Sequence, residues 1–226
     1  SETYTAKFDR DRNPFLHHFF HERIRLALDS CQLDGGTVID VGAGTGKLFD
    51  ELRAREIDAR YYGVDISAGM LRNSRIPAAY QMVGTLADVR SSLKTTGHVH
   101  FFALGVTTYM KPHDIRAMFS VASEIGGRGS TFTLTFSNRY SVDTAMQMLL
   151  TKFFSLARYM GKDIGSGRVA GGVVERTMVS RRQAVELLSR HADFLDMQYT
   201  NQCITPFNRL FPRASIAVER VLVGLL

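Results

Sequence analysis

The stretch that decides the fold is Val38–Leu48, which reads VIDVGAGTGKL. Its first residues are apolar and mostly β-branched, as in a buried strand, and glycines follow at positions 42, 44 and 46. Glycine permits backbone angles closed to other residues and lets a ligand approach the chain closely. Helical spacing resumes over residues 47–55, so the stretch predicts a strand, a glycine turn and a helix. Such a unit at the carboxyl end of a parallel sheet is a recurrent nucleotide site.

Two acids near this turn indicate which chemical groups the ligand carries. A dinucleotide-binding turn separates its three glycines by one residue and then by two, whereas the glycines here stand at every second position. Asp40 precedes them, and a carboxylate is a poor neighbour for a pyrophosphate but suits an ammonium group. Asp65 ends the next apolar run, where an acid can accept hydrogen bonds from both ribose hydroxyls. The predicted ligand is a nucleoside with a free ribose, an ammonium-bearing tail and no diphosphate, and S-adenosylmethionine fits this description.

Apolar runs and helical periodicities alternate along the chain, which favours an α/β fold with a mostly parallel, twisted sheet and helices on both faces. Further strands are expected at residues 61–65, 79–83, 100–104 and 130–136, and further helices at 14–29, 70–74, 113–125 and 142–160. Another helix is expected to begin at Ser180, with Gln183 completing a capping box.

The last third of the chain is less regular. Residues 161–172 contain five glycines, which predicts a mobile loop. Residues 192–204 are expected to contain a sixth strand. The spacing of apolar residues in 215–226 favours a helix, with a seventh strand as the alternative.

Three segments resemble the motifs of the class I S-adenosylmethionine-dependent methyltransferases. Thr37–Leu48 resembles their first motif, and Tyr62–Leu71 resembles the second-strand motif, in which an acid holds the ribose. Ala103–Pro112 resembles the fourth-strand segment that borders cofactor and acceptor. The resemblance spans about residues 36–137. It implies a Rossmann-like methyltransferase fold, S-adenosylmethionine as cofactor and S-adenosylhomocysteine as its product.

The resemblance also implies roles for individual residues. Asp40 would orient the amino group of the cofactor, and Asp65 would bind its ribose. The residues that would line the methionine part are Gly42, Ala43, Gly44 and Gly46. The remaining implied contacts are Ile66 and Met70 beside the adenine, and Leu104, Gly105 and Val106 beneath the cofactor.

Two positions depart from the family pattern. Where the family often has an acid that receives the adenine amino group, this chain has Thr85. Thr85 or Leu86 could bind the adenine through a hydroxyl or the backbone, or Asp88 could substitute. Near the start of the fourth strand, where an acid is usual, the chain has Val99 and His100. The adenine contacts are therefore less well defined by the sequence than the glycine turn.

Methyl transfer chiefly requires that acceptor, methyl and sulfur be aligned, and a base is needed only where the acceptor must lose a proton. Tyr109 and His113 follow the fourth strand and are the candidates to orient or deprotonate the acceptor. The alternative is that Tyr109 packs against the cofactor and that His113 simply begins a helix.

Acceptor contacts are expected from two further regions. If the N-terminal helix covers the site, Tyr4, Phe8, His17 and His21 would line the pocket; otherwise its histidines form a solvated face. His17 and His21 could share a metal, but nothing at ligand spacing completes a set, so no metal is expected. Residues 138–176 are expected to act as a cap or lid, with Arg168 and Arg176 either meeting an anionic group or remaining solvated.

Length and composition limit the possible domain organisation and the possible partners of the chain. The 226 residues suit one domain, 1–226, with a helical cap in 1–30, a cofactor-binding half in 36–137 and an inserted cap in 138–176. The net charge of +6 fits either an anionic acceptor or a basic surface. No basic stripe interleaved with aromatic residues points to nucleic acid. Cys31 and Cys203 are expected to be reduced packing residues of a cytoplasmic protein that has no transmembrane segment; its oligomeric state is left open.

These patterns together predict a methyltransferase that acts on an oxygen or nitrogen of a small or lipid-like molecule. Two rival hypotheses remain open from sequence. One is a nucleotide-dependent oxidoreductase, which the glycine spacing and Asp40 disfavour. The other is a regulatory protein that binds the cofactor without chemistry, which the departures at Thr85 and Val99 allow.

Overall fold

The computed structural model of the chain describes residues 14–33, 35–141, 166–169, 172–175, 177–200 and 207–224. Some of the sequence predictions lie outside these residues: the helix at 142–160, the site roles of Tyr4, Phe8 and Arg176, and the packing role of Cys203. No helix within the described ranges is both long enough and apolar enough to cross a membrane.

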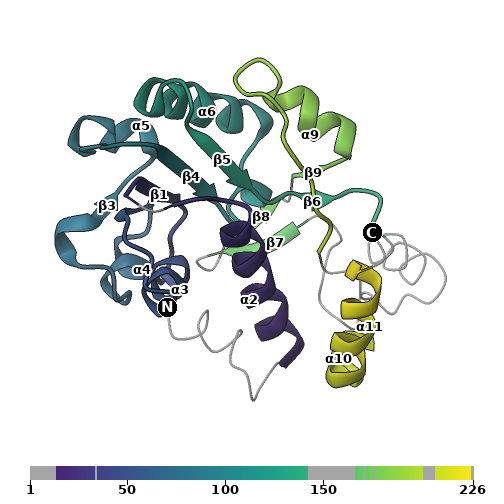
Figure 1. The fold of residues 1–226 in the computed structure, drawn as a ribbon. Helices are drawn as coiled ribbons and strands as arrows, with labels where there is room; N and C mark the ends of the chain where they lie inside the picture. The colour runs from purple at the N-terminus through teal and green to yellow at the C-terminus, as the bar shows by residue number, and fades with distance from the viewer. Residues whose placement is uncertain are drawn as a thin grey trace.

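A five-stranded parallel sheet forms the centre of the molecule (Figure 1). Its strands are β1 (Thr37–Val41), β2 (Arg60–Asp65), β3 (Gln81–Val83), β4 (Val99–Ala103) and β5 (Thr131–Leu134), in the order β3-β2-β1-β4-β5. Thr37 of β1 pairs with Arg60 on one side and with Val99 on the other. The chain therefore builds outward from β1 in one direction and then crosses to β4 to build in the other. The connections that follow β1 and β4 lead to opposite faces of the sheet at this reversal, which is where open α/β sheets bind ligands.

Helices cover both faces of the sheet, as predicted. On one face lie α5 (Leu86–Val89) and α6 (Pro112–Gly126), and on the other lie α2 (Pro14–Asp29), α3 (Lys47–Ala54) and α4 (Ala68–Arg72). Three short 3₁₀ turns, η1 (Ala78–Tyr80), η2 (Arg90–Ser92) and η3 (Thr107–Tyr109), complete this half. Alternate residues of the strands supply two separate clusters of buried side chains, one beneath each layer of helices.

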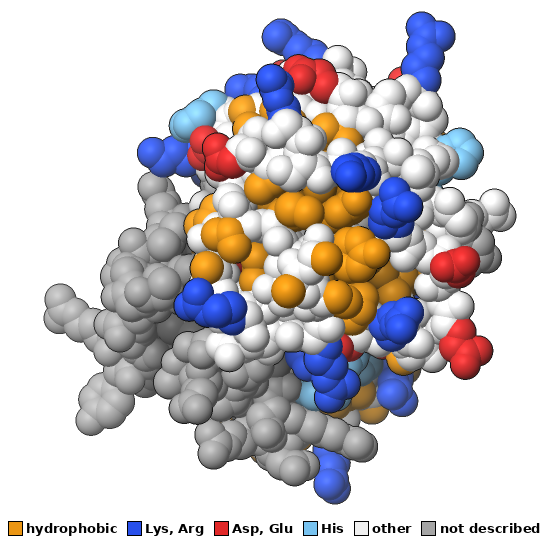
Figure 2. Space-filling view, turned by 90° about the vertical axis from the view of Figure 1, so that its left-hand side faces the viewer, with side chains coloured by type: hydrophobic (Ala, Val, Ile, Leu, Met, Phe, Trp, Pro, Cys, Tyr) orange, Lys and Arg blue, Asp and Glu red, His pale blue; other side chains and the backbone are white. Residues whose placement is uncertain are grey.

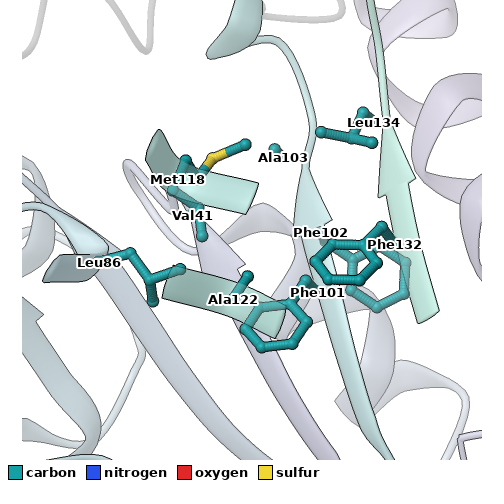
Figure 3. A pocket seen from close by; sticks show the side chains of 9 residues that line it. All are labelled: Val41, Leu86, Phe101, Phe102, Ala103, Met118, Ala122, Phe132 and Leu134. Atoms are coloured by element: carbon teal, nitrogen blue, oxygen red, sulfur yellow. The ribbon is translucent and has the colours of Figure 1, made fainter. Parts of the chain in front are cut away.

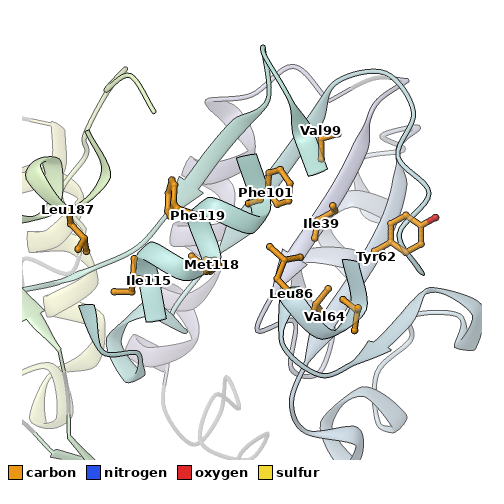
Figure 4. Packing of buried hydrophobic residues seen from close by; sticks show 13 residues of the cluster. Ile39, Tyr62, Val64, Leu86, Val99, Phe101, Ile115, Met118, Phe119 and Leu187 are labelled. Atoms are coloured by element: carbon orange, nitrogen blue, oxygen red, sulfur yellow. The ribbon is translucent and has the colours of Figure 1, made fainter. Parts of the chain in front are cut away.

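Helix α6 shows why the sequence folds in this way. Ile115, Met118, Phe119 and Ala122 recur at helical spacing, and all four are buried against the sheet (Figure 4). Pro112 occupies the first turn, and Gly127, with φ of +64°, follows the last. A small space between α6 and the sheet is lined only by apolar side chains, so it belongs to the core and offers no polar ligand a partner (Figure 3).

The C-terminal third departs from two predictions. Residues 166–169 are not a loop: they form β7 (Ser166–Val169), which pairs antiparallel with β8 (Gly172–Glu175). Val169, Val173 and Val174 favour strands, and the two intervening residues match a tight hairpin, a signal that the glycine content of the segment concealed. The predicted sixth strand is also wrong over residues 192–200, which form no strand. Leu195 there is 83% exposed, so its apolar side chain has no sheet to pack on.

Other C-terminal predictions are confirmed. Ser180 caps α9 (Arg181–Leu188), and its Oγ accepts from Gln183 N while Gln183 Oε1 accepts from Ser180 N. A short parallel pair of strands, β6 (Ser137–Asn138) and β9 (Met178–Val179), joins this part to the end of β5. The chain then forms α10 (Phe207–Leu210) and α11 (Pro212–Gly224), so the helical alternative for residues 215–224 is correct. Helix α11 packs against α2.

Candidate active site

The glycine turn and the loop after β4 lie against each other at the reversal of strand order. Backbone N–H groups of Gly42 and Ala43 both donate to the carbonyl of Val64, at 2.8 and 3.1 Å, which fixes the turn to the end of β2. On the other side, Gly105 N donates to Thr135 Oγ1 at 2.7 Å. A Cβ on Gly42 would lie 2.6 Å from Cβ of Val106, so the two loops are in close contact. The sequence predicted both loops as site elements, and the structure brings them together.

All three glycines of the turn need positive φ, at +79°, +56° and +76°. Gly42 has a second constraint, because an added Cβ would overlap Val106, whereas at Gly44 the nearest atom is the methyl carbon of Met70 at 3.4 Å. A left-handed conformation costs an L-residue about 1–2 kcal/mol at either position. Overpacking against Val106 adds a further cost at Gly42, typically about 1–3 kcal/mol.

We therefore expect Gly42→Ala to lower the free energy of unfolding by about 1–2 kcal/mol more than Gly44→Ala does. Urea unfolding of the two variants would measure this difference, with the positive φ of Gly44 serving as the matched control. Equal destabilisation would mean that Val106 moves away from the turn at little cost.

Asp65 fastens the turn from the end of β2. Its Oδ2 accepts from the backbone N–H of Gly44 at 2.8 Å, and its Oδ1 accepts from Ser67 N at 2.8 Å. The carboxylate is only half-buried, so each oxygen retains a lone pair toward the surface. The structure thus presents a fixed carboxylate beside the glycine turn, in the place where the sequence put the ribose acceptor.

An apolar surface continues outward from Asp65. Ile66, the next residue, is 78% exposed, and Val83, which pairs with Asp65 across β2 and β3, is 54% exposed. Met70 of α4 approaches the turn at Gly44. Figure 2 shows hydrophobic side chains gathered at the middle of the side on which β3 and α4 lie, with Lys and Arg around them. Exposed apolar side chains beside a fixed carboxylate suit a flat heterocycle attached to a sugar.

Asp40 lies below the turn and is 4% exposed. Burial raises the pKa of its carboxyl to about 7, while a 2.6 Å hydrogen bond donated by the Tyr61 hydroxyl opposes the rise. The charge of Asp65 raises this pKa further, and the charge of Arg23 lowers it. Burial, and then the adjacent Asp40, raise the pKa of Tyr61 far above its ordinary value, so the phenol remains the donor. Near neutral pH, Asp40 therefore changes between a neutral acid and a carboxylate.

The sequence did not identify Tyr61 or Arg23 as site residues. Tyr61 belongs to the neighbouring strand, and only the pairing of β1 with β2 brings its hydroxyl to Asp40. Arg23 lies on α2 with its guanidinium carbon 4.7 Å from the centre of the Phe20 ring. One signal was available: Arg23 is a charged residue beside the apolar stripe of Phe20, Ile24 and Ala27, where a solvated charge is not expected.

In the segment after β3, the hydroxyl of Thr85 is already hydrogen-bonded, whereas the sequence analysis considered it as a ligand of the adenine. Thr85 Oγ1 donates to Asp88 Oδ2 at 2.6 Å, and Thr85 N donates to the same oxygen at 2.9 Å, forming a capping box on α5. These bonds to Thr85 lower the pKa of Asp88. The Leu86 side chain is buried in the core. Both polar side chains are thus engaged in the cap, and so are the backbone N–H and carbonyl of Thr85.

The two candidate catalytic residues differ in their position and in their exposure to solvent. Tyr109 ends η3, directly after the loop of Gly105 and Val106, and is 38% exposed. His113 begins α6 with its side chain 72% exposed, and its Nε2 lies 3.2 Å from Asp114 Oδ1. The Tyr109 segment is held from the far side, where Thr177 N donates to Thr108 O at 2.8 Å. The backbone around Tyr109 is therefore tied to Val106, the residue that contacts the glycine turn.

Helix α2 reaches the site through Arg23. A Cβ on Gly105 would lie 2.7 Å from Nη1 of Arg23, so α2 is in contact with the loop after β4. The rings of His17 and His21 lie 4.2 Å apart, and His21 is exposed. Arg168 belongs to β7. Among the described residues, no cluster of three His, Cys, Asp or Glu side chains could hold a metal ion.

Comparisons with known proteins agree with this geometry. Residues 38–125 match the model of a family described as a methyltransferase domain. Among solved structures, magnesium protoporphyrin IX methyltransferase of Synechocystis PCC 6803, with bound S-adenosylhomocysteine, superimposes with a TM-score of 0.54 at 16% identity, over 81% of this chain and 76% of that one. An S-adenosylmethionine-dependent methyltransferase of Methanosarcina mazei gives 0.54 at 16% identity, over 80% and 90%.

A third structure is a complex between the Haloferax volcanii Trm112 methyltransferase activator and a methyltransferase. The matched chain of this complex gives a TM-score of 0.57 at 17% identity, over 94% of this chain and 85% of that one. No curated protein is significantly similar in sequence. The matched residues 38–125 run from β1 into α6 and contain the glycine turn, Asp65 and the loop after β4. Residues 38–125 thus match a methyltransferase domain, and the fold of the chain is that of S-adenosylmethionine-dependent methyltransferases of known structure.

Proposed function

We propose that this chain transfers the methyl group of S-adenosylmethionine to an oxygen or nitrogen of a small or lipid-like, largely apolar molecule. The observation that carries this proposal is the surface at the carboxyl end of β4. Val106 and Met110, both partly buried and apolar, flank the exposed Tyr109 beside the glycine turn. The hydroxyls of Thr108 and Ser137 lie 3.1 Å apart and engage each other. An acceptor placed here would meet apolar side chains and one phenol.

The groups at this site are those that the cofactor would need for its charges and hydrogen bonds. Asp65 would hold the ribose hydroxyls, with Ile66 and Met70 beside the adenine and the segment of Thr85 and Leu86 at its edge, where the backbone of Leu86 would make the contact. The turn of Gly42, Ala43, Gly44 and Gly46 would take the methionine part, with the buried Asp40 beneath it. Leu104, Gly105 and Val106 would form the floor. When bound, the cofactor supplies an activated methyl group on a sulfonium.

The residues of the chain then need only to align the acceptor with the methyl group and to accept its proton. The loop after β4 fixes the direction of approach, because Gly105 N is bonded to Thr135 and Val106 is wedged against Gly42. Holding the reacting atoms in line supplies much of the acceleration in such a displacement. Tyr109 would orient the acceptor and, in its ionised form, accept the proton that an oxygen or nitrogen loses on methylation. His113 faces solvent and would act only on an acceptor that extends over the start of α6.

Two solved relatives of the fold have apolar partners in keeping with this acceptor class: the magnesium protoporphyrin IX methyltransferase and a mycolic acid cyclopropane synthase, CmaA1. Another, HEN1, is a small RNA methyltransferase, so RNA is the rival acceptor. An anionic group on the acceptor would find the positive net charge of the chain favourable. The free thiol of Cys31 is in keeping with a reducing, cytoplasmic setting.

The test has two stages. Thermal unfolding with S-adenosylmethionine, S-adenosylhomocysteine or NADH should show stabilisation by the first two alone; stabilisation by NADH alone would overturn the proposal. Transfer of a radiolabelled methyl group is then measured against separate lipid, polar small-molecule and RNA fractions of a cell extract, and mass spectrometry identifies the product. We expect label in a small-molecule or lipid fraction. Label in RNA alone would reject the acceptor class, and cofactor binding with no transfer to any fraction would favour a regulatory protein.

With the acceptor identified, Tyr109→Phe tests the catalytic assignment. We expect this change to lower kcat about a hundredfold, as removal of a general base does, while Kd for S-adenosylhomocysteine stays unchanged. His113→Gln is the comparison variant and should have a much smaller effect, because its side chain faces solvent. Unchanged kcat in Tyr109→Phe would assign Tyr109 to packing, and loss of kcat in His113→Gln alone would transfer the role to His113.

A further inference from the structure

Helix α11 buries polar side chains and exposes apolar ones. Ser215 and Glu219 of this helix are only 6% and 1% exposed, whereas Val218 and Val221 are 53% and 63% exposed. A helix on the surface of a globular protein ordinarily has the opposite arrangement, with its apolar side toward the core. We infer that the exposed side of α11 binds the surface of a membrane that contains anionic lipids, an interaction that goes beyond the proposed function.

The exposed apolar residues form one continuous side of the helix. Successive residues of an α-helix are rotated by about 100° around its axis. Four exposed residues of α11 therefore fall within about 100° of one another: Ala214, Ala217, Val218 and Val221. Leu210 and Phe211, which directly precede the helix, are 66% and 59% exposed. Exposed apolar side chains gathered in this way indicate a docking surface.

Two arginines follow one edge of this apolar side. Arg213 and Arg220 are exposed and seven residues apart, so they lie within about 20° of each other around the helix axis. Glu219 is the only acid in the sequence of α11, and it is buried. Glu22 of α2 is within electrostatic reach of Arg220, but it is already bonded to Arg25 at 2.5 Å. The exposed side of α11 thus combines apolar side chains with positive charge.

An anionic bilayer supplies both partners that this surface needs. Apolar side chains of such a helix enter the boundary between headgroups and acyl chains, and the arginines beside them bind lipid phosphates. A second copy of α11 would supply apolar side chains but no carboxylate for the arginines, because Glu219 is buried. The net charge of +6 also favours an anionic surface over a neutral one. Charge complementarity therefore selects the membrane as the partner.

Helix α2 connects this surface to the active site (Figure 1). Helix α11 packs against α2, where His18 Nε2 lies 4.0 Å from Glu219 Oε2. Five residues further along α2, Arg23 contacts the loop after β4 at Gly105. A membrane bound to α11 would therefore lie one helix away from the proposed acceptor region. The inference concerns membrane binding alone and holds whether or not the chain transfers a methyl group.

Co-sedimentation of the full chain with lipid vesicles tests the inference. We expect binding to vesicles made of equal parts of phosphatidylglycerol and phosphatidylcholine, and binding about tenfold weaker or less to phosphatidylcholine alone. Raising NaCl from about 0.1 to about 0.5 M should weaken the binding to the anionic vesicles, because salt screens the arginines. Neither cofactor nor acceptor is present, so failure of the proposed function would leave this result unchanged.

Two double variants separate the apolar and the charged contributions. Val218→Gln combined with Val221→Gln should weaken binding to the anionic vesicles about tenfold or more, because two apolar side chains no longer enter the lipid. Arg213→Gln combined with Arg220→Gln should weaken it about tenfold and remove most of the salt dependence. All four residues are exposed, so both variants should fold, and thermal unfolding without vesicles verifies this.

Matched controls change the same properties elsewhere on the surface. Arg181→Gln combined with Arg182→Gln removes the same charge from two exposed positions at the start of α9. Leu195→Gln removes an apolar side chain that is 83% exposed and lies outside α11. Both controls should bind the anionic vesicles as tightly as the wild type does.

Four outcomes would overturn the inference. Lack of binding to either kind of vesicle would reject a membrane as the partner. Equal binding to both compositions would show that the arginines do not select an anionic surface. Equal losses in the arginine variants of α11 and α9 would indicate a general charge effect. A dimer in sedimentation velocity that Val218→Gln with Val221→Gln dissociates would assign the exposed side of α11 to a second copy of the chain.

Discussion

Asp65→Ala should weaken the binding of S-adenosylhomocysteine by about a hundredfold or more, equivalent to about 3 kcal/mol. Two losses combine. The ribose hydroxyls lose a charged acceptor, and the glycine turn loses the oxygen that accepts from Gly44 N at 2.8 Å. The second loss was not evident from sequence, which indicated Asp65 only as a ribose ligand. Because Ser67 N also loses its acceptor, the entry into α4 should loosen as well.

Calorimetric titration measures the affinity, and urea unfolding separates the contribution of folding. Asp58→Ala is the control, because Asp58 is an exposed acid in the connection before β2 and its removal changes the net charge equally. Asp65→Asn retains one oxygen and should lie between the wild type and Asp65→Ala. Full affinity in Asp65→Ala would show that the ribose is placed wrongly, and with it the nucleoside end of the site.

Asp40→Asn should have opposite effects on stability and on cofactor binding, and both effects should depend on pH. The pKa of Asp40 is about 7 in the folded chain, above its ordinary value of 3.8. Between these values the folded state holds a proton that the unfolded state has released, so the stability from this group is complete below about pH 4. It decreases as pH rises and is lost once the pH passes 7. Asparagine cannot ionise, and its oxygen can still accept from the Tyr61 hydroxyl.

At pH 8, Asp40→Asn should therefore raise the free energy of unfolding by about 2–4 kcal/mol relative to the wild type. At pH 5 the difference should be smaller, about 1–1.5 kcal/mol, and it should vanish only below about pH 4. Affinity for S-adenosylhomocysteine should change in the other direction: at pH 8 the variant should bind about ten- to hundredfold more weakly because the ammonium loses its carboxylate partner. Urea unfolding and calorimetry at both pH values measure the two effects.

Each half of this prediction can fail separately. Equal stability of the two proteins at pH 8 would mean that Asp40 ionises without cost. Equal affinity at pH 8 would mean that the ammonium does not contact Asp40. Tyr61→Phe is a useful companion: it removes the hydrogen bond that stabilises the carboxylate, so the pKa of Asp40 should rise further and the pH dependence should move upward.

The sequence was most informative where local chemistry and local structure coincide. The strand at Thr37–Val41, the glycine turn and helix α6 depend on residues close together in the chain, and the structure has them as predicted. Residues 166–169 and 192–200 were predicted less well. There, glycine content concealed a valine-rich hairpin, and apolar residues such as Leu195 resembled a strand without a neighbour to pair with. A strand needs a partner in the fold, which local patterns do not reveal.

The sequence by itself predicted the cofactor, because glycines at alternate positions and an acid at the end of the next strand are close together in the chain and correspond to what the ligand requires. Only the tertiary structure decided which side chains surround these residues. The pairing of β1 with β2 gives Asp40 its Tyr61 partner, and the packing of α2 brings Arg23 onto Gly105. The physical reason is that the pKa of a buried acid and the position of a charged head group depend on neighbours that are distant in sequence.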